Sequence, residues 1–227
     1  MAIIQCDFYS MARRGFVSFS AVLPVEKPPL PDQAPAYAEG PFPTLYLLHG
    51  YSGNRNDWLI NTRIAELAAR RGIAVILPDG RNGFYLDNVE SQDFCGEFIG
   101  HELVDVTRKM FPLSHRREDT AIGGLSMGGY GAIRNGLKYT ETFGAILSHS
   151  AALITDEVSA MREGEGNHMA PYAYYRHTFG EPKELLQSDK DPKELAKQCV
   201  VNGTMPKLFL ACGSEDFLFD QNSSFHT

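Results

Sequence analysis

The sequence lacks several features that would assign it to a class of protein at once. No apolar run approaches the roughly 20 residues of a membrane span, and the first residues, with Gln5 and Asp7, lack the apolar core of an export signal. Lys and Arg form no run longer than a pair, and the net charge is −7. These absences argue against a membrane protein and against a surface for nucleic acid or anionic lipid.

Cysteine is also scarce, and the spacings that hold metals are missing. The four cysteines contain no Cys-x-x-Cys pair, so we expect free thiols and a cytoplasmic protein. His101-Glu102 starts like a zinc-binding His-Glu-x-x-His, but Asp105 stands where the second histidine is needed. The stretch from Arg162 to His168 has carboxylates and a histidine without metal spacing. Neither stretch therefore predicts a metal site.

What is present is an ordinary globular composition. The 227 residues are 43% hydrophobic and 22% charged, which suits one domain over residues 1–227 with a sizeable core. Seven of the 13 prolines lie between Pro24 and Pro43. That segment is excluded from regular helices and central strands, and we interpret it as a long surface connection.

The apolar pattern alternates between strands and helices. Residues 3–11 and 15–23 are predicted to form an antiparallel strand pair. Five short apolar runs that stop at glycine or polar residues are typical of buried parallel strands: 44–48, 73–77, 120–122, 143–147 and 207–211. Helical spacing occurs at 58–70, 94–110 and 127–139, and in two pieces over 182–197. The order predicts an α/β fold, with helices on both faces of a mostly parallel sheet.

A candidate nucleophile follows one of these strands. Gly124-Leu125-Ser126-Met127-Gly128 is a Gly-x-Ser-x-Gly motif between an apolar strand and a helix rich in small residues. A serine on such a sharp turn is exposed, and the helix start beside it favours a developing oxyanion. The alternative is a plain Gly/Ser turn.

Two further loops follow apolar strands, at the edge where active sites of such sheets lie. His49-Gly50-Tyr51-Ser52-Gly53-Asn54 is placed to supply an oxyanion hole from the backbone N–H of Tyr51 with that of Met127. The alternative for this loop is a simple turn. Asp216, after the last strand, is placed to orient a catalytic histidine, with Glu215 and Asp220 as competitors.

The histidine itself is the gap in this pattern. The chain order Ser, Asp, His requires a histidine after Asp216. Only His226 stands there, in a segment that the pattern predicts to enter a helix. His149 ends a strand near the serine but is out of order. We interpret His49 as structural and the remaining loop histidines as solvated: His115, His168 and His177.

These motifs resemble those of the esterase D group of α/β-hydrolases. The resemblance rests on 123–132 around the serine, on 45–54 with Trp58 after it, and on 212–218, and it extends over about residues 3–226. The nearest members are tributyrin esterases and the feruloyl or acetyl-xylan esterases of carbohydrate esterase family 1. S-formylglutathione hydrolases of the same group usually carry histidine where Tyr130 stands.

The resemblance implies a serine carboxylesterase without metal or cofactor, acting on short-chain acyl esters or acylated sugars. Ser126 would be the nucleophile, Asp216 the triad acid, and Tyr51 and Met127 the oxyanion donors. Alternatives on the same scaffold are a thioesterase like S-formylglutathione hydrolase, an acyltransferase and an inactive binding protein. A homo-oligomer is compatible with the sequence.

Two regions bear on the completeness of the site. Residues 151–206 are long for a crossover and resemble a cap, whose aromatics would either wall a pocket or pack the insertion on the sheet: Tyr172, Tyr174, Tyr175 and Phe179. Members of the resembled group continue through a further strand to a histidine-bearing segment. We therefore expect the C-terminal strand and helix to be missing, the catalytic histidine to lie beyond residue 227, and residues 207–211 to form an exposed edge strand.

Overall fold

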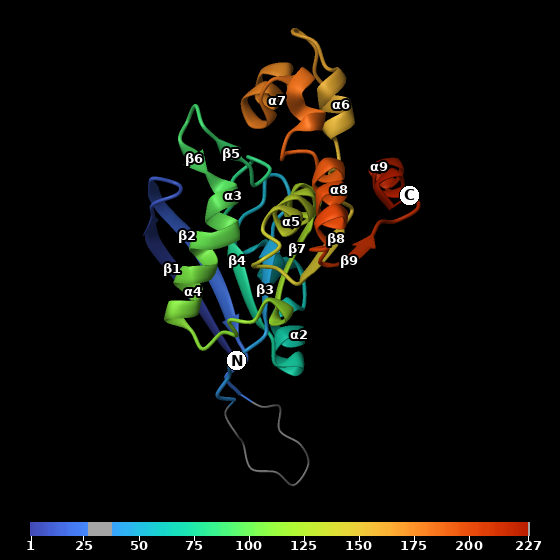
Figure 1. Ribbon diagram of the computed structural model, residues 1–227. Helices are drawn as coiled ribbons and strands as arrows, with labels where there is room; N and C mark the ends of the chain where they lie inside the picture. Colours follow the sequence, from blue (N-terminus) through green and yellow to red (C-terminus); the bar gives the residue numbers. More distant parts are fainter. Residues whose placement is uncertain (27–37, 227) are drawn as a thin grey trace.

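The computed structural model describes residues 1–26 and 38–226, and its centre is a seven-stranded sheet (Figure 1). The spatial order is β1-β2-β4-β3-β7-β8-β9. Its strands are β1 (Ala2–Ser10), β2 (Gly15–Leu23), β3 (Thr44–Leu48), β4 (Ala74–Pro78), β7 (Thr120–Leu125), β8 (Ala145–His149) and β9 (Lys207–Ala211). A separate small hairpin pairs β5 (Asp87–Asn88) with β6 (Asp93–Phe94).

Strand direction follows the predicted pattern. The pair β1–β2 is antiparallel, as is β2–β4, while β4, β3, β7, β8 and β9 run parallel to one another. The carboxyl ends of β3, β7 and β8 therefore meet at one edge, because Leu48 pairs with Gly124 and Leu125 pairs with His149. This register brings the loops after three strands together at one place.

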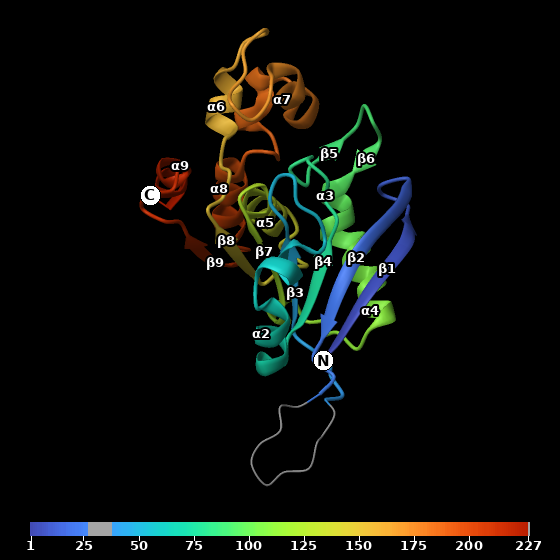
Figure 2. The same cartoon turned by 180° about the vertical axis from the view of Figure 1, so that it is seen from behind.

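Helices cover both faces of the sheet (Figures 1 and 2). Leu47 and Val75 point to the face covered by α1 (Asp57–Asn61) and α2 (Ile64–Arg71). Tyr46 and Ile76, one residue away in each strand, belong to the larger core on the other face, because successive strand side chains alternate. That core includes residues of α4 (Leu103–Met110), α5 (Met127–Lys138) and α8 (Pro192–Asn202).

Two predicted helices are interrupted. The stretch 58–70 was expected as one helix, but Thr62 is extended (φ −140°, ψ 174°) between α1 and α2. Its hydroxyl donates to the Trp58 carbonyl and accepts from the Ile64 N–H, a local alternative to helical bonding that threonine favours. The stretch 94–110 is helical but contains a π turn, η1 (Phe98–Glu102), between α3 (Cys95–Glu97) and α4.

A group of short helices stands above the carboxyl ends of the strands (Figure 1). It consists of α6 (Thr155–Ala160), α7 (Tyr172–Phe179) and the 3₁₀ helix η3 (Pro182–Gln187), and we call it the cap. A shorter 3₁₀ helix, η2 (Arg117–Asp119), precedes β7. The interpretation of residues 24–43 as a surface connection falls largely outside the described residues. Within the described ranges, no helix is long and apolar enough to cross a membrane.

The sheet ends in an open edge at β9. This strand pairs with β8 alone in the seven-stranded sheet, and Phe209 is 54% exposed. The loop after β9 enters α9 (Phe219–His226), which lies beside that edge in both views (Figures 1 and 2). The expected exposure of residues 207–211 is therefore found.

Candidate active site

Ser126 occupies a strained turn between β7 and α5. Its backbone has φ 56° and ψ −117°, a region that non-glycine residues rarely adopt and that costs about 1–3 kcal/mol. The turn is held because the Ser126 N–H donates to the His149 carbonyl at 3.0 Å, and the Ser126 carbonyl accepts from Tyr130 and Ala152 N–H groups at 3.0 Å each. The conformation lifts the side chain out of both regular elements.

The glycines of the motif allow this turn to pack closely. A Cβ at Gly124 would overlap the backbone of Gly128, and a Cβ at Gly128 would overlap the carbonyls of Leu48 and His49. Backbone atoms cannot swing aside, so these contacts require glycine. The start of α5 is thereby pressed against the end of β3, next to the loop that follows it.

That loop, residues 49–54, is fixed from several sides. His49 is 1% exposed; its Nε2 accepts from the Gly80 N–H at 2.9 Å, which leaves Nδ1 to donate to the Gly50 carbonyl at 2.7 Å. The Tyr85 hydroxyl donates to the His49 carbonyl at 2.9 Å, and the Trp58 indole donates to the Leu48 carbonyl at 3.0 Å. His49 is therefore a structural residue of the loop, as expected.

A cavity of about 290 Å³ opens beside Ser126. Tyr51 and Met127 line it with the serine, and within the described residues neither backbone N–H donates a hydrogen bond. Two unengaged N–H groups beside a serine hydroxyl form an arrangement that can stabilise an oxyanion. The rest of the wall is mainly apolar and aromatic, with Phe84, Ile154, Tyr174, Tyr175 and Phe217 among its residues.

Asp216 lies in the loop between β9 and α9, next to the end of β8. Its carboxylate accepts from the Leu218 N–H at 2.9 Å. That bond and one from the Ser150 hydroxyl hold the pKa of Asp216 below its usual value, so the group is ionised at neutral pH. Asp216 is partly exposed, whereas its competitors Glu215 and Asp220 are exposed.

None of the seven histidines hydrogen-bonds Ser126 in the part of the chain that the structure describes. The His149 ring packs on Phe209, with centroids 6.0 Å apart, and His226 lines a groove beside β9. His168 is exposed, as expected, and it also lines the cavity. His177 belongs to α7 rather than to a loop, and His115 is exposed as expected.

Comparisons with known proteins identify the family of the chain. Residues 29–222 match a family described as putative esterase. The chain is 47% identical over 223 residues to an acetyl esterase of Caldicellulosiruptor saccharolyticus, a match that covers 98% of this chain and 84% of that protein. The chain belongs to the putative esterase family.

Solved structures place this esterase among the α/β-hydrolases. A fluorophosphonate-binding serine hydrolase of Staphylococcus aureus superposes with a TM-score of 0.82 and 26% identity, over 99% of this chain and 84% of the other. An S-formylglutathione hydrolase of the same organism gives a TM-score of 0.79 at 26% identity, with the same coverage. The predicted α/β-hydrolase fold is confirmed.

The cap of the esterase contributes residues that the motifs did not reveal. Glu157, Asn167 and His168 line the cavity, as does Gln221 from α9. They follow no strand and belong to no motif, so only the tertiary positions of the cap and of α9 bring them to the serine. Of the cap aromatics, Tyr174 and Tyr175 wall the cavity. Phe179 instead packs between Phe84 and Tyr130, with ring centroids 4.9 and 5.7 Å away, so both interpretations of these aromatics hold in part.

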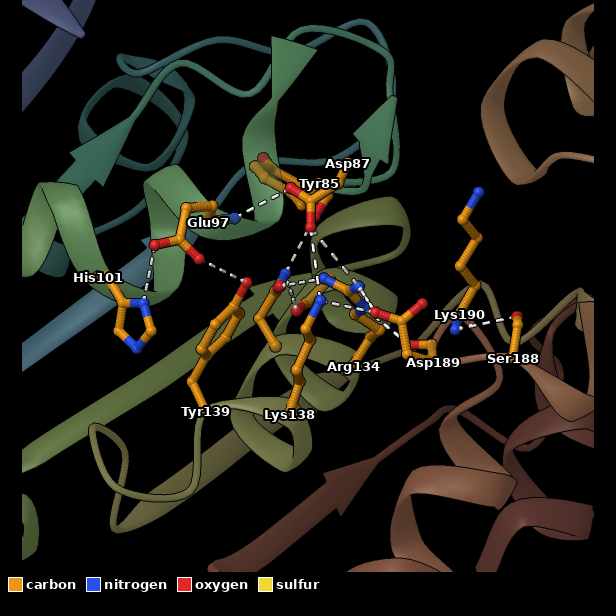
Figure 3. A network of polar contacts seen from close by, with 12 residues as sticks. Tyr85, Asp87, Glu97, His101, Arg134, Lys138, Tyr139, Ser188, Asp189 and Lys190 are labelled. Carbon is orange, nitrogen blue, oxygen red and sulfur yellow. Dashed lines mark hydrogen bonds and ion pairs between the residues drawn. The ribbon is translucent and has the colours of Figure 1, made fainter. Parts of the chain in front are cut away.

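A polar network fastens the cap to the helix that follows Ser126 (Figure 3). Arg134 of α5 is 1% exposed and donates to the Asp189 carbonyl at 2.9 Å and to its carboxylate at 2.6 Å. Lys138 donates to the same carboxylate at 2.6 Å, and Asp87 lies 3.9 Å from Arg134. Burial alone would raise the pKa of Asp189, but Arg134 and Lys138 outweigh it and hold that pKa below its usual value.

The segment after η3 continues this attachment. Tyr130, one helical turn before Arg134, donates its hydroxyl to the Lys190 carbonyl at 2.5 Å, and the Lys190 ammonium donates to the Phe179 carbonyl at 3.1 Å. Gly96 makes room for the arginine, since a Cβ there would overlap its guanidinium and approach Asp87 to 3.0 Å. The nucleophile turn and the cap that roofs the cavity are thus joined through one helix face.

Proposed function

We propose that the protein is a serine carboxylesterase that hydrolyses short-chain acyl esters, acetyl esters or acetylated and feruloylated sugars among them. The observation that carries the proposal is the strained Ser126 turn, which opens with two unengaged backbone N–H groups onto a cavity of about 290 Å³. That volume lies at the small end for ligand sites and suits a short acyl chain. The likeness to an acetyl esterase supports the same substrate class.

The reaction proceeds in two steps. The Ser126 oxygen attacks the ester carbonyl carbon as its proton passes to a histidine base, and the oxyanion is held by the N–H groups of Tyr51 and Met127. The tetrahedral intermediate breaks its bond to the alcohol oxygen, which takes the proton and leaves. Water then attacks the acyl-serine and releases the acid and the free hydroxyl. Asp216 orients and charge-balances the histidine base. We assign the role of this base to none of the seven histidines described.

Turnover of p-nitrophenyl acetate and butyrate tests the proposal. Ser126→Ala should lower kcat by about 10³-fold or more, whereas Ser159→Ala, at a half-buried cap residue that does not line the cavity, should leave it unchanged. Asp216→Asn should cost about 10²–10⁴-fold, while Glu215→Gln and Asp220→Asn should not. Turnover that survives in Ser126→Ala, or no turnover in the unmodified protein, would overturn the assignment.

A second candidate rests on the structural likeness to an S-formylglutathione hydrolase. A thioester presents the same carbonyl to the same serine, so the geometry of the turn serves either substrate. Parallel assays with S-formylglutathione and p-nitrophenyl acetate rank the two by kcat/KM. Adding an acceptor alcohol shows whether acyl transfer competes with hydrolysis.

A further inference from the structure

The inference concerns the charge of the cavity beside Ser126 and rests on the proposed function. Of the described residues that line it, none is lysine or arginine. Its polar members are Ser126, Glu157, Asn167, His168, Gln221 and tyrosines. Glu157, on the cap helix α6, is the one carboxylate among these described residues. A bound substrate therefore faces a wall of apolar and polar side chains that carries one carboxylate.

The Glu157 carboxylate is held in a defined direction. The Asn167 amide nitrogen donates to Glu157 Oε1 at 2.8 Å. The oxygen of the same amide accepts from the N–H groups of Met169 and Ala170 at 2.9 and 3.1 Å, and from the Tyr175 hydroxyl at 2.9 Å. Because these donors fix the amide orientation, its nitrogen must face the glutamate.

Within the described part of the chain, no cationic side chain pairs with this carboxylate. Glu157 takes part in no ion pair among residues 1–26 and 38–226, whereas the neighbouring Asp156 on the same helix pairs with Lys193 at 2.6 Å. An unpaired charge at the wall of a partly apolar cavity acts on any charged group of a bound ester. Since Glu157 is solvent-exposed, water and salt reduce this effect without removing it.

We propose that Glu157 is a specificity-determining residue that makes the esterase reject esters bearing a carboxylate and favour neutral or cationic ones. For one partly screened charge a few ångströms away, we expect kcat/KM to differ by about threefold to tenfold between a charged ester and its neutral counterpart. The rule applies to the acyl and the alcohol side alike. It disfavours glutathione thioesters, whose thiol carries two carboxylates and one ammonium.

Matched substrates test the rule. p-Nitrophenyl butyrate and p-nitrophenyl hemisuccinate share a four-carbon acyl chain and a leaving group, and differ in a terminal methyl or carboxylate. Acetylthiocholine and 3,3-dimethylbutyl thioacetate differ only in a cationic nitrogen or a neutral carbon. Glu157→Gln should raise kcat/KM for the hemisuccinate relative to the butyrate by about threefold to tenfold, chiefly through KM. The same substitution should lower kcat/KM for acetylthiocholine relative to 3,3-dimethylbutyl thioacetate by a similar factor. In 1 M salt both effects should shrink.

Glu163→Gln is the matched control, because it removes the same charge from the same cap at a residue that does not line this cavity. It should move neither ratio by more than about twofold. Unchanged ratios in Glu157→Gln, with activity on the neutral esters retained, would overturn the inference.

A binding measurement separates this inference from the proposed function. Phenyltrimethylammonium is titrated by NMR into the unmodified protein and into Glu157→Gln. Weaker binding in the variant supports the charge rule even if no ester is turned over, in which case only the proposed function fails. Equal binding in both proteins, like equal ratios, refutes the role of Glu157.

Discussion

The ion pairs between Asp189 and helix α5 should be a main contributor to the stability of this protein, and Asp189→Asn removes their negative charge with little change of shape. The Asp189 carboxylate accepts from both Arg134 and Lys138 at 2.6 Å. Arg134 is 1% exposed, so the substitution leaves a buried guanidinium whose nearest remaining carboxylate is Asp87 at 3.9 Å.

The magnitude follows from how far each partner is buried. Breaking a fully buried pair costs about 3–5 kcal/mol, but the Asp189 side chain is 44% exposed, and both Asp87 and the Asp189 carbonyl remain beside Arg134. We therefore expect a loss of about 2 kcal/mol in the free energy of unfolding, since solvent screens the exposed part. For a chain of this size, that lowers Tm by about 4–8 °C.

Urea unfolding followed by circular dichroism measures this loss. Because the pKa of Asp189 is lowered in the folded state, its contribution is present above the unfolded pKa near 4 and disappears as the pH falls through the folded value. The difference between the unmodified protein and Asp189→Asn should therefore shrink below about pH 4. Glu181→Gln is the control, because its ion pair with Arg176 is about half exposed on both sides and should therefore contribute little to stability. A loss below about 0.5 kcal/mol for Asp189→Asn, or one no larger than the control's, would refute the reasoning.

Three further perturbations probe the site and its supports. Gly128→Ala forces a Cβ against the Leu48 carbonyl, so ester turnover should fall by about 10²-fold or more through loss of the oxyanion geometry; Gly83→Ala, with open space around it, should leave the rate unchanged. Trp58→Phe removes the hydrogen bond to the same carbonyl and should cost about 1–2 kcal/mol in urea unfolding, a prediction that an unchanged midpoint would contradict. Burial would lower the pKa of His101, but its hydrogen bonds to two glutamates outweigh burial and raise this pKa. The contribution of His101 to folding stability is thus complete below about pH 6.5 and is lost as the pH rises through the folded pKa. His101→Gln should accordingly flatten the decline of stability above that pH, by less than about 1 kcal/mol.

The strands of the sheet could be predicted because their environment leaves a simple pattern. Residues 44–48 and 207–211 coincide with β3 and β9, and the antiparallel pair was found where the alternation placed it. The other parallel strands are displaced by one to three residues at their ends. Helix continuity was harder, because the break at Thr62 depends on a side-chain hydrogen bond that apolar spacing does not reveal.

The residues of the site also divide into those that the sequence predicts and those that it does not. Ser126, Tyr51 and Met127 stand at fixed offsets from strand ends, and since the register of parallel strands aligns those ends, the sequence predicts their meeting at one cavity. Glu157 and His168 reach the same cavity from the cap. Their position depends on how the segment around Asp189 is fastened to α5, which is a tertiary contact between residues 55 positions apart. No local pattern encodes it.

The room that Gly96 leaves for Arg134 has an evolutionary consequence. A side chain at position 96 would displace the guanidinium, and without the guanidinium the Asp189 carboxylate loses one of its two cations. Substitutions at these three positions should therefore be inherited together rather than one at a time. Across relatives, a residue larger than glycine at 96 should coincide with a shorter or uncharged residue at 134 and with a non-acidic residue at 189. The cap of such relatives would be free to sit at a different height over the serine, which offers the lineage a route to larger esters.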